Sequence, residues 1–284
     1  MIRIEGNLEE LRRKISLLRA GKGSVGLVPT MGFLHEGHLS LVRTSMKENG
    51  ATIVSIFVNP TQFGPNEDFD AYPRDLGRDL GLLEKEGADL VFCPSPETLY
   101  APDHSTFVNE GQVSLDLCGA FRAGHFRGVC TIVLKLLNLV MPDRAYFGEK
   151  DFQQLLVIRR MVRDLNVPVE IRGCPIVREK DGLALSSRNV YLAAGERESA
   201  LALNRSLLEA KERFEHGETR GSVLVEGVKA FLNRDPGLKV DYVELRDAED
   251  LSSIDTVDRP AVLALAVRVG KTRLIDNTVL DGVK

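Results

Sequence analysis

Two patterns of apolar positions alternate along the first 175 residues of the chain. Apolar residues at helical spacing predict helices over residues 7–21, 38–48, 75–87, 129–140 and 153–165. Between them, short continuous apolar runs predict strands over residues 25–29, 52–58, 88–94, 144–148 and 169–175. Buried strands that alternate with helices are typical of an α/β fold with a doubly wound, mostly parallel sheet covered on both faces.

The pattern changes in the charged turn that contains Gly182. Beyond it, helical spacing predicts helices over residues 196–214 and 223–234, and apolar runs predict strands over residues 240–245, 261–267 and 272–276. These elements indicate a second, smaller α+β domain of ordinary size. We place the larger domain at residues 1–177, a hinge at 178–184 and the smaller domain, which would close over the site, at 185–284.

Composition narrows the possible partners. The 284 residues suffice for two domains that each bury a core. The formal net charge of -4 argues against a nucleic-acid partner, because such binding needs a basic face that displaces counterions. The four cysteines form no C-x-x-C pair, so we expect buried free thiols and neither a zinc nor a redox motif.

We expect a cytoplasmic protein with no membrane segment. The start of the chain lacks the basic residues and apolar run that mark a secretory signal. The longest apolar run, residues 131–141, is too short to span a bilayer and is interrupted by Lys135 and Asn138.

Two histidines follow the strand predicted over residues 25–29. The segment PTMGFLHEGHL places His35 and His38 three residues apart, just after a turn at Gly32. In doubly wound sheets, ligands bind beyond the carboxyl ends of the strands. Gly32 lets the backbone approach a ligand closely, and the following helix N-terminus offers free N–H groups to an anion. These features favour a phosphate site, which two residues on one helix face can address together.

There are two alternatives to a phosphate site for the pair. Zinc would need a third ligand, but His104, His125 and His216 are isolated in the sequence and no H-E-x-x-H occurs, so we predict no protein-held metal site. The other alternative is one functional and one structural histidine.

Uncharged polar side chains follow the strand over residues 52–58. Asn59 and Gln62 could hydrogen-bond a hydroxyl or carboxylate of a small ligand without adding charge. Alternatively, N-P-T-Q is a turn in which Asn59 and Pro60 serve the backbone.

Candidate phosphate ligands occur in two further segments. Gly148 ends a predicted strand, Lys150 is a candidate phosphate cation, and Asp151 could be a ribose ligand or a helix cap. At the predicted domain junction, residues 186–188 read S-S-R. The serine hydroxyls could donate hydrogen bonds to phosphate, and the guanidinium of the arginine could donate two at once. The alternative there is a capping serine followed by a surface arginine.

The H-x-G-H and S-S-R elements together resemble the HIGH and KMSKS signatures of adenylate-forming class I synthetases and nucleotidyltransferases. Longer motifs are more specific: PTMGFLHEGHLSL, SIFVNPTQFGPNEDFDAYPR, GHFRGVCTIVLKLLNLVMPDRAYFGEKDFQQL, CPIVRE and DGLALSSRNVYL are similar, in order, to the pantothenate synthetase family. The last hundred residues match more loosely. Leu185 stands where the family usually has Met and Phe33 where Ala is common, but neither change removes a polar group.

This resemblance implies a Rossmann-like sheet and an ATP-dependent, AMP-forming ligase of pantothenate biosynthesis. The implied reaction condenses (R)-pantoate with β-alanine through a pantoyl-adenylate, with release of pyrophosphate and then AMP. It also implies Mg²⁺, which would bridge phosphate oxygens while retaining water, and a homodimer.

The resemblance also implies the site residues. His38 would be the proton donor, with His35 beside it, and Lys150 and Arg188 complete the predicted catalytic set. Gln62 and Gln154 would hold pantoate, Gln62 would also face β-alanine, and Asn59 would support them. The predicted nucleotide ligands are Met31, Gly32, Phe33, Leu34, His35, Glu36, Gly37, His38, Gly148, Glu149, Lys150, Asp151, Val177, Leu185, Ser186, Ser187 and Arg188.

Other functions share parts of this pattern. An adenylyltransferase with a phosphate-bearing acceptor would show both signatures but should supply extra cations, whereas the acceptor candidates here are neutral. A non-catalytic nucleotide-binding module would bind ATP without pantoate-dependent pyrophosphate release. A class I aminoacyl-tRNA synthetase is disfavoured by the short C-terminal part and the acidic balance.

Overall fold

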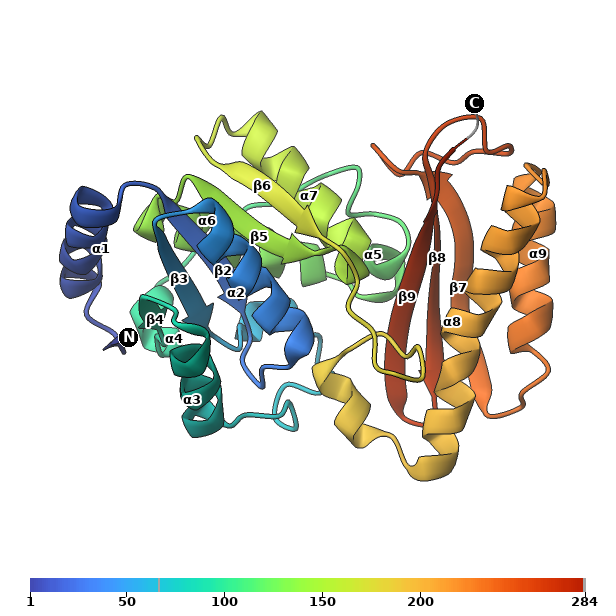
Figure 1. Ribbon diagram of the computed structural model, residues 1–284, viewed down its shortest axis with the longest axis horizontal. Coiled ribbons are helices and arrows are strands. Elements are labelled where there is room, and N and C mark those ends of the chain that lie inside the picture. Colours follow the sequence, from blue (N-terminus) through green and yellow to red (C-terminus); the bar gives the residue numbers. More distant parts are fainter. Residues whose placement is uncertain (66, 283–284) are drawn as a thin grey trace.

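The chain folds into two units that lie side by side, each with its own sheet (Figure 1). This computed structural model describes residues 1–65 and 67–282. The larger unit contains a six-stranded sheet and the smaller unit a three-stranded sheet. The division at residues 178–184 stays a prediction, but the two sheets match the expected fold class.

The larger unit alternates strands and helices. Its strands are β1 (Ile2–Ile4), β2 (Val25–Thr30), β3 (Ala51–Ile56), β4 (Leu90–Phe92), β5 (Arg144–Gly148) and β6 (Glu170–Cys174). Its helices are α1 (Leu8–Lys22), α2 (Glu36–Glu48), α3 (Leu76–Glu86), α4 (Pro96–Leu99), α5 (Cys118–Phe121), α6 (His125–Val140) and α7 (Phe152–Asp164), with short 3-10 turns η1 (Pro60–Gln62) and η2 (Glu149–Asp151). The six strands pair in parallel in the order β1-β4-β3-β2-β5-β6.

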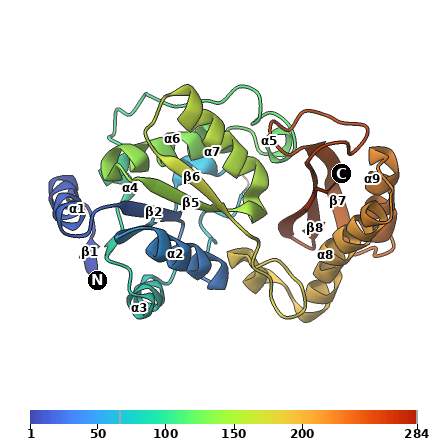
Figure 2. The ribbon, with the colours of Figure 1, turned by 45° about the horizontal axis from the view of Figure 1, so that its top comes forward.

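Helices cover both faces of this sheet, as the apolar strand runs predict. Helices α6 and α7 lie on one face and α2 on the other (Figure 2). Successive residues of β3 point to opposite faces: Ile53 joins the core under α6, and Val54 joins the core under α2. Burial on both sides explains why this strand reads as a continuous apolar run.

The smaller unit packs helices on one face of an antiparallel sheet. Its elements are η3 (Ser187–Tyr191), α8 (Ala194–Glu215), α9 (Gly221–Leu232), β7 (Leu238–Asp247), β8 (Ala261–Val269) and β9 (Thr272–Leu280). The sheet order is β7-β8-β9, and Leu203, Leu224 and Leu265 are buried in the core between the sheet and the helices. This agrees with the predicted small α+β unit, although each strand is longer than predicted.

Several predicted element bounds were incomplete. Helix α6 begins at His125, four residues before the predicted start, and β1, α4 and α5 were not predicted. Three- and four-residue elements carry too few apolar positions to show a period.

The order of the strands in the larger sheet indicates where a ligand would bind. From β2 the chain passes to β3 and β4 on one side, then returns through α6 to β5 and β6 on the other side of β2. The crevice between β2 and β5 is therefore the topological switch point, where ligands of open parallel sheets bind. The histidine turn after β2 and the lysine turn after β5 both border it.

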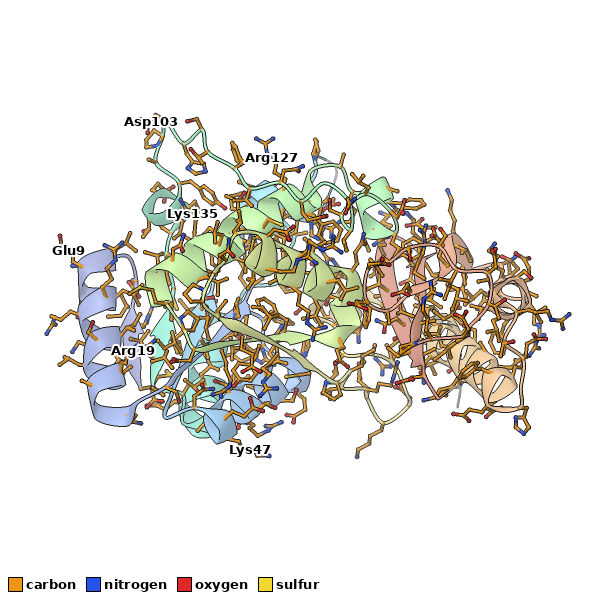
Figure 3. The ribbon with its side chains drawn as sticks, turned by 90° about the horizontal axis from the view of Figure 1, so that it is seen from above. Glu9, Arg19, Lys47, Asp103, Arg127 and Lys135 are labelled. Carbon is orange, nitrogen blue, oxygen red and sulfur yellow. The ribbon has the colours of Figure 1, made fainter. Side chains whose placement is uncertain are left out.

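Charged side chains lie on the outer surface of the larger unit. Glu9, Lys47 and Asp103 lie at the periphery of the larger unit (Figure 3). Within the described part of the chain, no helix has the length and apolar character needed to cross a bilayer.

Candidate active site

A cavity of about 220 Å³ lies beyond the carboxyl ends of β2, β3 and β5. It brings together segments that are far apart in the sequence. The predicted residues that line it are Met31, His35, Gly37, His38, Asn59, Gln62, Gly148, Lys150, Asp151, Gln154, Val177, Leu185, Ser186, Ser187 and Arg188. Five other predicted ligands do not line it: Gly32, Phe33, Leu34, Glu36 and Glu149.

The two histidines touch each other at the start of α2. His35 precedes the helix, and its backbone N–H donates to Nδ1 of His38 at 3.3 Å. The ring centroids are 4.0 Å apart. Because Nδ1 of His38 accepts this bond, the proton of the neutral ring sits on Nε2.

Both rings are neutral at physiological pH. Burial lowers the pKa of His35 to about 4, and the Lys150 cation adds to the effect. Burial, followed by His35 and Lys150, also holds the pKa of His38 well below its ordinary value. The pair therefore offers N–H hydrogen-bond donors rather than imidazolium charges.

A buried aspartate fixes the turn before the histidines. Gly32 adopts φ 82° and Phe33 φ 48°, so the chain passes through the left-handed region twice. Asp79 of α3 is 1% exposed, and its carboxylate accepts from the backbone N–H groups of Phe33 at 2.7 Å and Leu34 at 2.8 Å. The sequence did not reveal this role, since an aspartate in the first turn of a helix is ordinary.

The glycine between the histidines is required by close packing. A Cβ on Gly37 would lie 2.9 Å from Cε1 and 3.0 Å from Nδ1 of His35. Any larger residue there would displace the His35 ring. The glycine of H-x-G-H is therefore needed to leave room for that ring.

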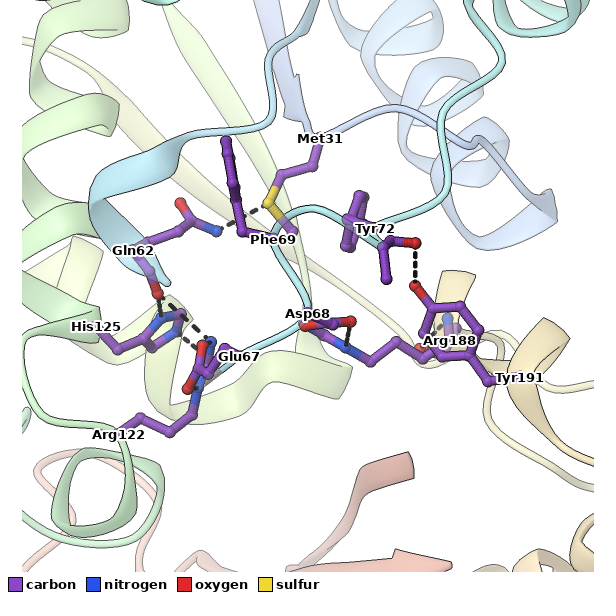
Figure 4. Close-up of polar contacts among 12 residues, drawn as sticks. Met31, Gln62, Glu67, Asp68, Phe69, Tyr72, Arg122, His125, Arg188 and Tyr191 are labelled. Atoms are coloured by element: carbon purple, nitrogen blue, oxygen red, sulfur yellow. Dashed lines mark hydrogen bonds and ion pairs between the residues drawn. The ribbon is translucent and has the colours of Figure 1, made fainter. Parts of the chain in front are cut away.

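Gln62 and Asn59 form the uncharged wall of the cavity. Gln62 is largely buried, and its Nε2 lies 2.9 Å from the Met31 sulfur (Figure 4). Asn59 accepts from Thr61 and Tyr100, and it donates to Gln62 and to the backbone carbonyl of Gly128. Asn59 therefore orients the turn, which supports the turn interpretation of its role.

Behind Gln62 lies a charged cluster that the sequence did not reveal. His125 Nδ1 contacts the backbone carbonyl of Gln62 at 2.8 Å, and His125 Nε2 contacts Arg122 Nη1 at 2.9 Å (Figure 4). Glu67 pairs with Arg122 at 2.6 Å. Burial, with Arg122 adding to it, lowers the pKa of His125 to about 4. Since arginine can only donate, the neutral ring accepts at Nε2 and donates from Nδ1–H to Gln62.

The lysine turn faces the histidines across the switch point. Lys150 lies in η2 with its Nζ 3.7 Å from the Asp151 carboxylate, and it lowers the pKa of both histidines. Asp151 occupies the N-cap position of α7, but within the described part of the chain its side chain makes no capping hydrogen bond. The helix-cap interpretation of Asp151 is therefore wrong.

The serine–arginine segment crosses to the larger unit. Ser186 Oγ accepts from the Arg188 backbone N–H at 3.2 Å, so it does cap η3, and Ser187 Oγ lies 3.3 Å from the Phe33 carbonyl oxygen. Arg188 forms a bidentate ion pair with Asp68, donating from Nε at 2.8 Å and from Nη2 at 2.7 Å (Figure 4). It is therefore no free surface arginine, and the same fork geometry suits phosphate.

A second cavity of about 350 Å³ separates the two units. It shares Lys150, Asp151, Gln154, Ser186 and Arg188 with the first cavity and extends to the small sheet. Three of the predicted phosphate ligands, Lys150, Ser186 and Arg188, therefore line both cavities.

Comparisons with known proteins agree with this geometry. A family model described as Pantoate-beta-alanine ligase matches residues 3–279. The pantothenate synthetase of Pseudothermotoga lettingae is 56% identical over 98% of each chain, and that of Thermotoga neapolitana is 56% identical over 98% of this chain and all of its own.

Two solved structures are also similar. The pantothenate synthetase of Thermus thermophilus superposes with a TM-score of 0.94 at 45% identity, covering 99% of this chain and 100% of that one. A pantoate-beta-alanine ligase from Francisella tularensis, complexed with beta-gamma ATP and beta-alanine, has a TM-score of 0.79 at 33% identity over 98% and 97% of the two chains.

Proposed function

The chain belongs to the pantoate-beta-alanine ligase family, and from this premise we propose how its first cavity carries out the reaction. The protein is an ATP-dependent ligase that joins pantoate to β-alanine to give pantothenate. One observation carries the assignment of the site: hydrogen-bond donors and cations from three distant segments line the same cavity as the uncharged amides of Asn59, Gln62 and Gln154. Such a cavity suits a triphosphate facing a small hydroxy acid.

In the first step, a carboxylate oxygen of pantoate attacks the α-phosphorus of ATP. A P–O bond forms while the bond to the bridging oxygen breaks, and pyrophosphate leaves. Both reactants are anionic, so the site must neutralise phosphate charge and align the attack. We assign this work to His35, His38, Lys150 and residues 186–188, with His38 donating from its neutral Nε2–H to a phosphate oxygen as charge develops.

In the second step, the unprotonated amine of β-alanine attacks the acyl carbon of pantoyl-adenylate. The C–N bond forms, the bond from the acyl carbon to the phosphate oxygen breaks, AMP leaves and the amine loses its extra proton to solvent. Gln62 and Gln154, which both line the first cavity, are the proposed amide ligands of pantoate. Closure of the smaller unit would exclude water and protect the mixed anhydride from hydrolysis.

Pyrophosphate release, measured with and without each substrate, tests this function. We expect release with ATP and pantoate alone, and pantothenate plus AMP once β-alanine is added. A dinucleotide product would instead support an adenylyltransferase. ATP binding with no pantoate-dependent release would leave only a nucleotide-binding module.

Mg²⁺ is also part of the proposal. Among the described residues, no three His, Cys, Asp or Glu side chains gather as a metal site. Asp68 and Asp151 are acidic side chains that pair with Arg188 and Lys150, two of the proposed phosphate ligands. Mg²⁺ prefers phosphate oxygens and retained water, so this sparse donor set fits an ion that would neutralise phosphate charge when bound. EDTA should abolish pyrophosphate release, and added Mg²⁺ should restore it.

A homodimer in the cytoplasm completes the proposal, and its support is the family resemblance. Sedimentation equilibrium tests the dimer: a mass near that of one 31.4 kDa chain would contradict it. Cell fractionation tests the location.

A further inference from the structure

A buried asparagine of the smaller unit holds the lysine turn of the larger unit. Asn277 lies on β9, the strand of the small sheet nearest the larger unit (Figure 1). Its side chain is 4% exposed, and Nδ2 donates to the backbone carbonyls of Glu149 and Lys150, each at 3.0 Å. One amide therefore binds two successive carbonyl groups of η2 from the opposite unit.

Asn277 is itself held in place. The Asp276 carboxylate accepts from the Asn277 backbone N–H at 2.8 Å, and the same carboxylate forms a fork with Arg178 at 2.7 and 2.9 Å. Asp276 is 3% exposed, so its carboxylate is shielded from water, whereas Arg178 is partly exposed. The Asn277 backbone is therefore held in place. A side chain can position another residue only if its own backbone is fixed in this way.

The bonds act on the backbone from which the lysine side chain leaves. Lys150 has a long flexible side chain, and its direction at the backbone depends on the orientation of the neighbouring peptide groups. The amide of Asn277 fixes the carbonyls on both sides of the Lys150 Cα, at Glu149 and at Lys150 itself. Nζ then lies close enough to the histidine pair to lower both pKa values.

We propose that Asn277 is a positioning residue for adenylation: it sets the peptide groups of η2 and so aims Lys150 at the phosphates of ATP. The inference rests on the proposed function, because it assumes that Lys150 meets phosphate. It adds that the smaller unit contributes directly to the geometry of the phosphate site.

A double-mutant cycle tests the inference. Formation of pantoyl-adenylate is followed in single-turnover reactions of the full-length enzyme with ATP and pantoate. Asn277→Ala should slow this step by roughly 10- to 100-fold in the wild-type background, because small misplacements of a catalytic group cost about that much. In a Lys150→Ala background the same change should cost less than about 3-fold, since coupled residues are not additive.

Two controls separate positioning from mere loss of contact between units. Asp116→Asn removes an ion pair, 2.9 Å between Asp116 and Arg246, that also joins the units, and among the described residues neither side chain is hydrogen-bonded to η2. We expect that variant to stay within about 2-fold of the wild type, because Asp116 is 55% exposed and Arg246 keeps its ion pair with Glu244. Asn277→Ser keeps a polar group at the buried position but cannot reach both carbonyls, and it replaces the alanine variant if that one does not fold.

The outcomes are distinct. Equal fold losses from the Asn277 change in both backgrounds, or no loss at all, would overturn the positioning role. A wild-type enzyme without pantoate-dependent pyrophosphate release would instead overturn the proposed function.

Discussion

At the scale of single residues, the protonation state of the histidine pair decides the chemistry. Burial and the Lys150 cation keep both rings neutral, and the His35 backbone N–H fixes which nitrogen of His38 carries the proton. A neutral ring can stabilise a developing oxyanion by donating from Nε2–H without first taking up a proton. The proton-donor role that the resemblance implies for His38 would therefore be that of a hydrogen-bond donor in this site.

Removing that donor should slow adenylation. We expect His38→Ala to reduce single-turnover formation of pantoyl-adenylate by roughly 10²- to 10³-fold, the usual cost of losing one donor to a developing charge. His38→Gln should lose less, because its amide can donate from a similar place. His216→Ala, which changes an exposed histidine at the end of α8, is the control. A rate for His38→Ala within a few-fold of the wild type would end this assignment.

The tautomer can be measured directly. Nitrogen-15 NMR of the imidazole rings should find His38 protonated at Nε2 only. Neither the His35 nor the His38 signal should titrate near the ordinary histidine pKa of about 6.5, because the pKa of His35 is lowered to about 4 and that of His38 also lies well below its ordinary value. An inflection between about pH 6 and 7 for either ring would contradict the neutral pair.

The sequence predicted the ligand-facing residues better than the residues that hold them. His35, His38 and Lys150 could be found because each follows a strand that reads clearly as apolar. Asp68 and Asp79 could not, since they act across 120 and 45 residues of chain on Arg188 and Leu34. Nothing local in a sequence encodes such a pairing.

At the scale of elements, α6 and η1 meet at a glycine. A Cβ on Gly128 would lie 2.4 Å from the Thr61 carbonyl oxygen and 2.6 Å from the Gln62 backbone nitrogen. The same glycine carbonyl accepts from Asn59 at 3.1 Å. The predicted helix begins after Gly128, because glycine weakens helices. The structure keeps glycine inside the helix so that the turn carrying Gln62 can lie against it.

Filling that space should damage the pantoate site. Gly128→Ala must displace η1 or bend α6, so we expect a loss of about 1–3 kcal/mol in the free energy of unfolding, typical of overpacking. The KM for pantoate should also rise. Gly81→Ala is the matched control, since Gly81 lies inside α3 and no atom of the described residues is within 4 Å of the added Cβ. It should stabilise by roughly 0.5–1 kcal/mol. Equal effects of the two changes in urea unfolding would contradict this reasoning.

At the scale of the whole molecule, polar contacts tie the predicted hinge to the smaller unit. Arg178 pairs with Asp276 of β9, and Glu179 and Asp181 both pair with Arg197 of α8. A movement of the smaller unit would therefore carry residues 178–184 with it. The chain would then bend on the N-terminal side of Arg178, before the predicted hinge.

Acid should destabilise the whole fold through three histidines. The pKa is lowered to about 4 in His35 and His125, and well below its ordinary value in His38. Between about pH 6.5 and 4 these histidines are protonated in the unfolded chain but remain neutral in the folded chain. The free energy of unfolding must therefore fall as the pH falls. Each histidine contributes a slope of up to about 1.4 kcal/mol per pH unit. Lowered carboxylate pKa values, as in Glu67, act in the same direction from about pH 5 downward.

Urea unfolding at a series of pH values across this window measures the slope. His125→Asn removes one of the three titrating rings while its amide can still donate to the Gln62 carbonyl, in place of Nδ1–H at 2.8 Å. We expect this variant to lose about a third of the slope, because groups that are far apart contribute independently. His35 and His38 are in contact, so their shares are coupled, whereas His125 lies behind Gln62 and can be separated. An unchanged slope in the variant would show that His125 is already protonated in the folded protein. The hydrogen bond between His125 Nε2 and Arg122 would then be wrong, because a protonated imidazole cannot accept from a guanidinium.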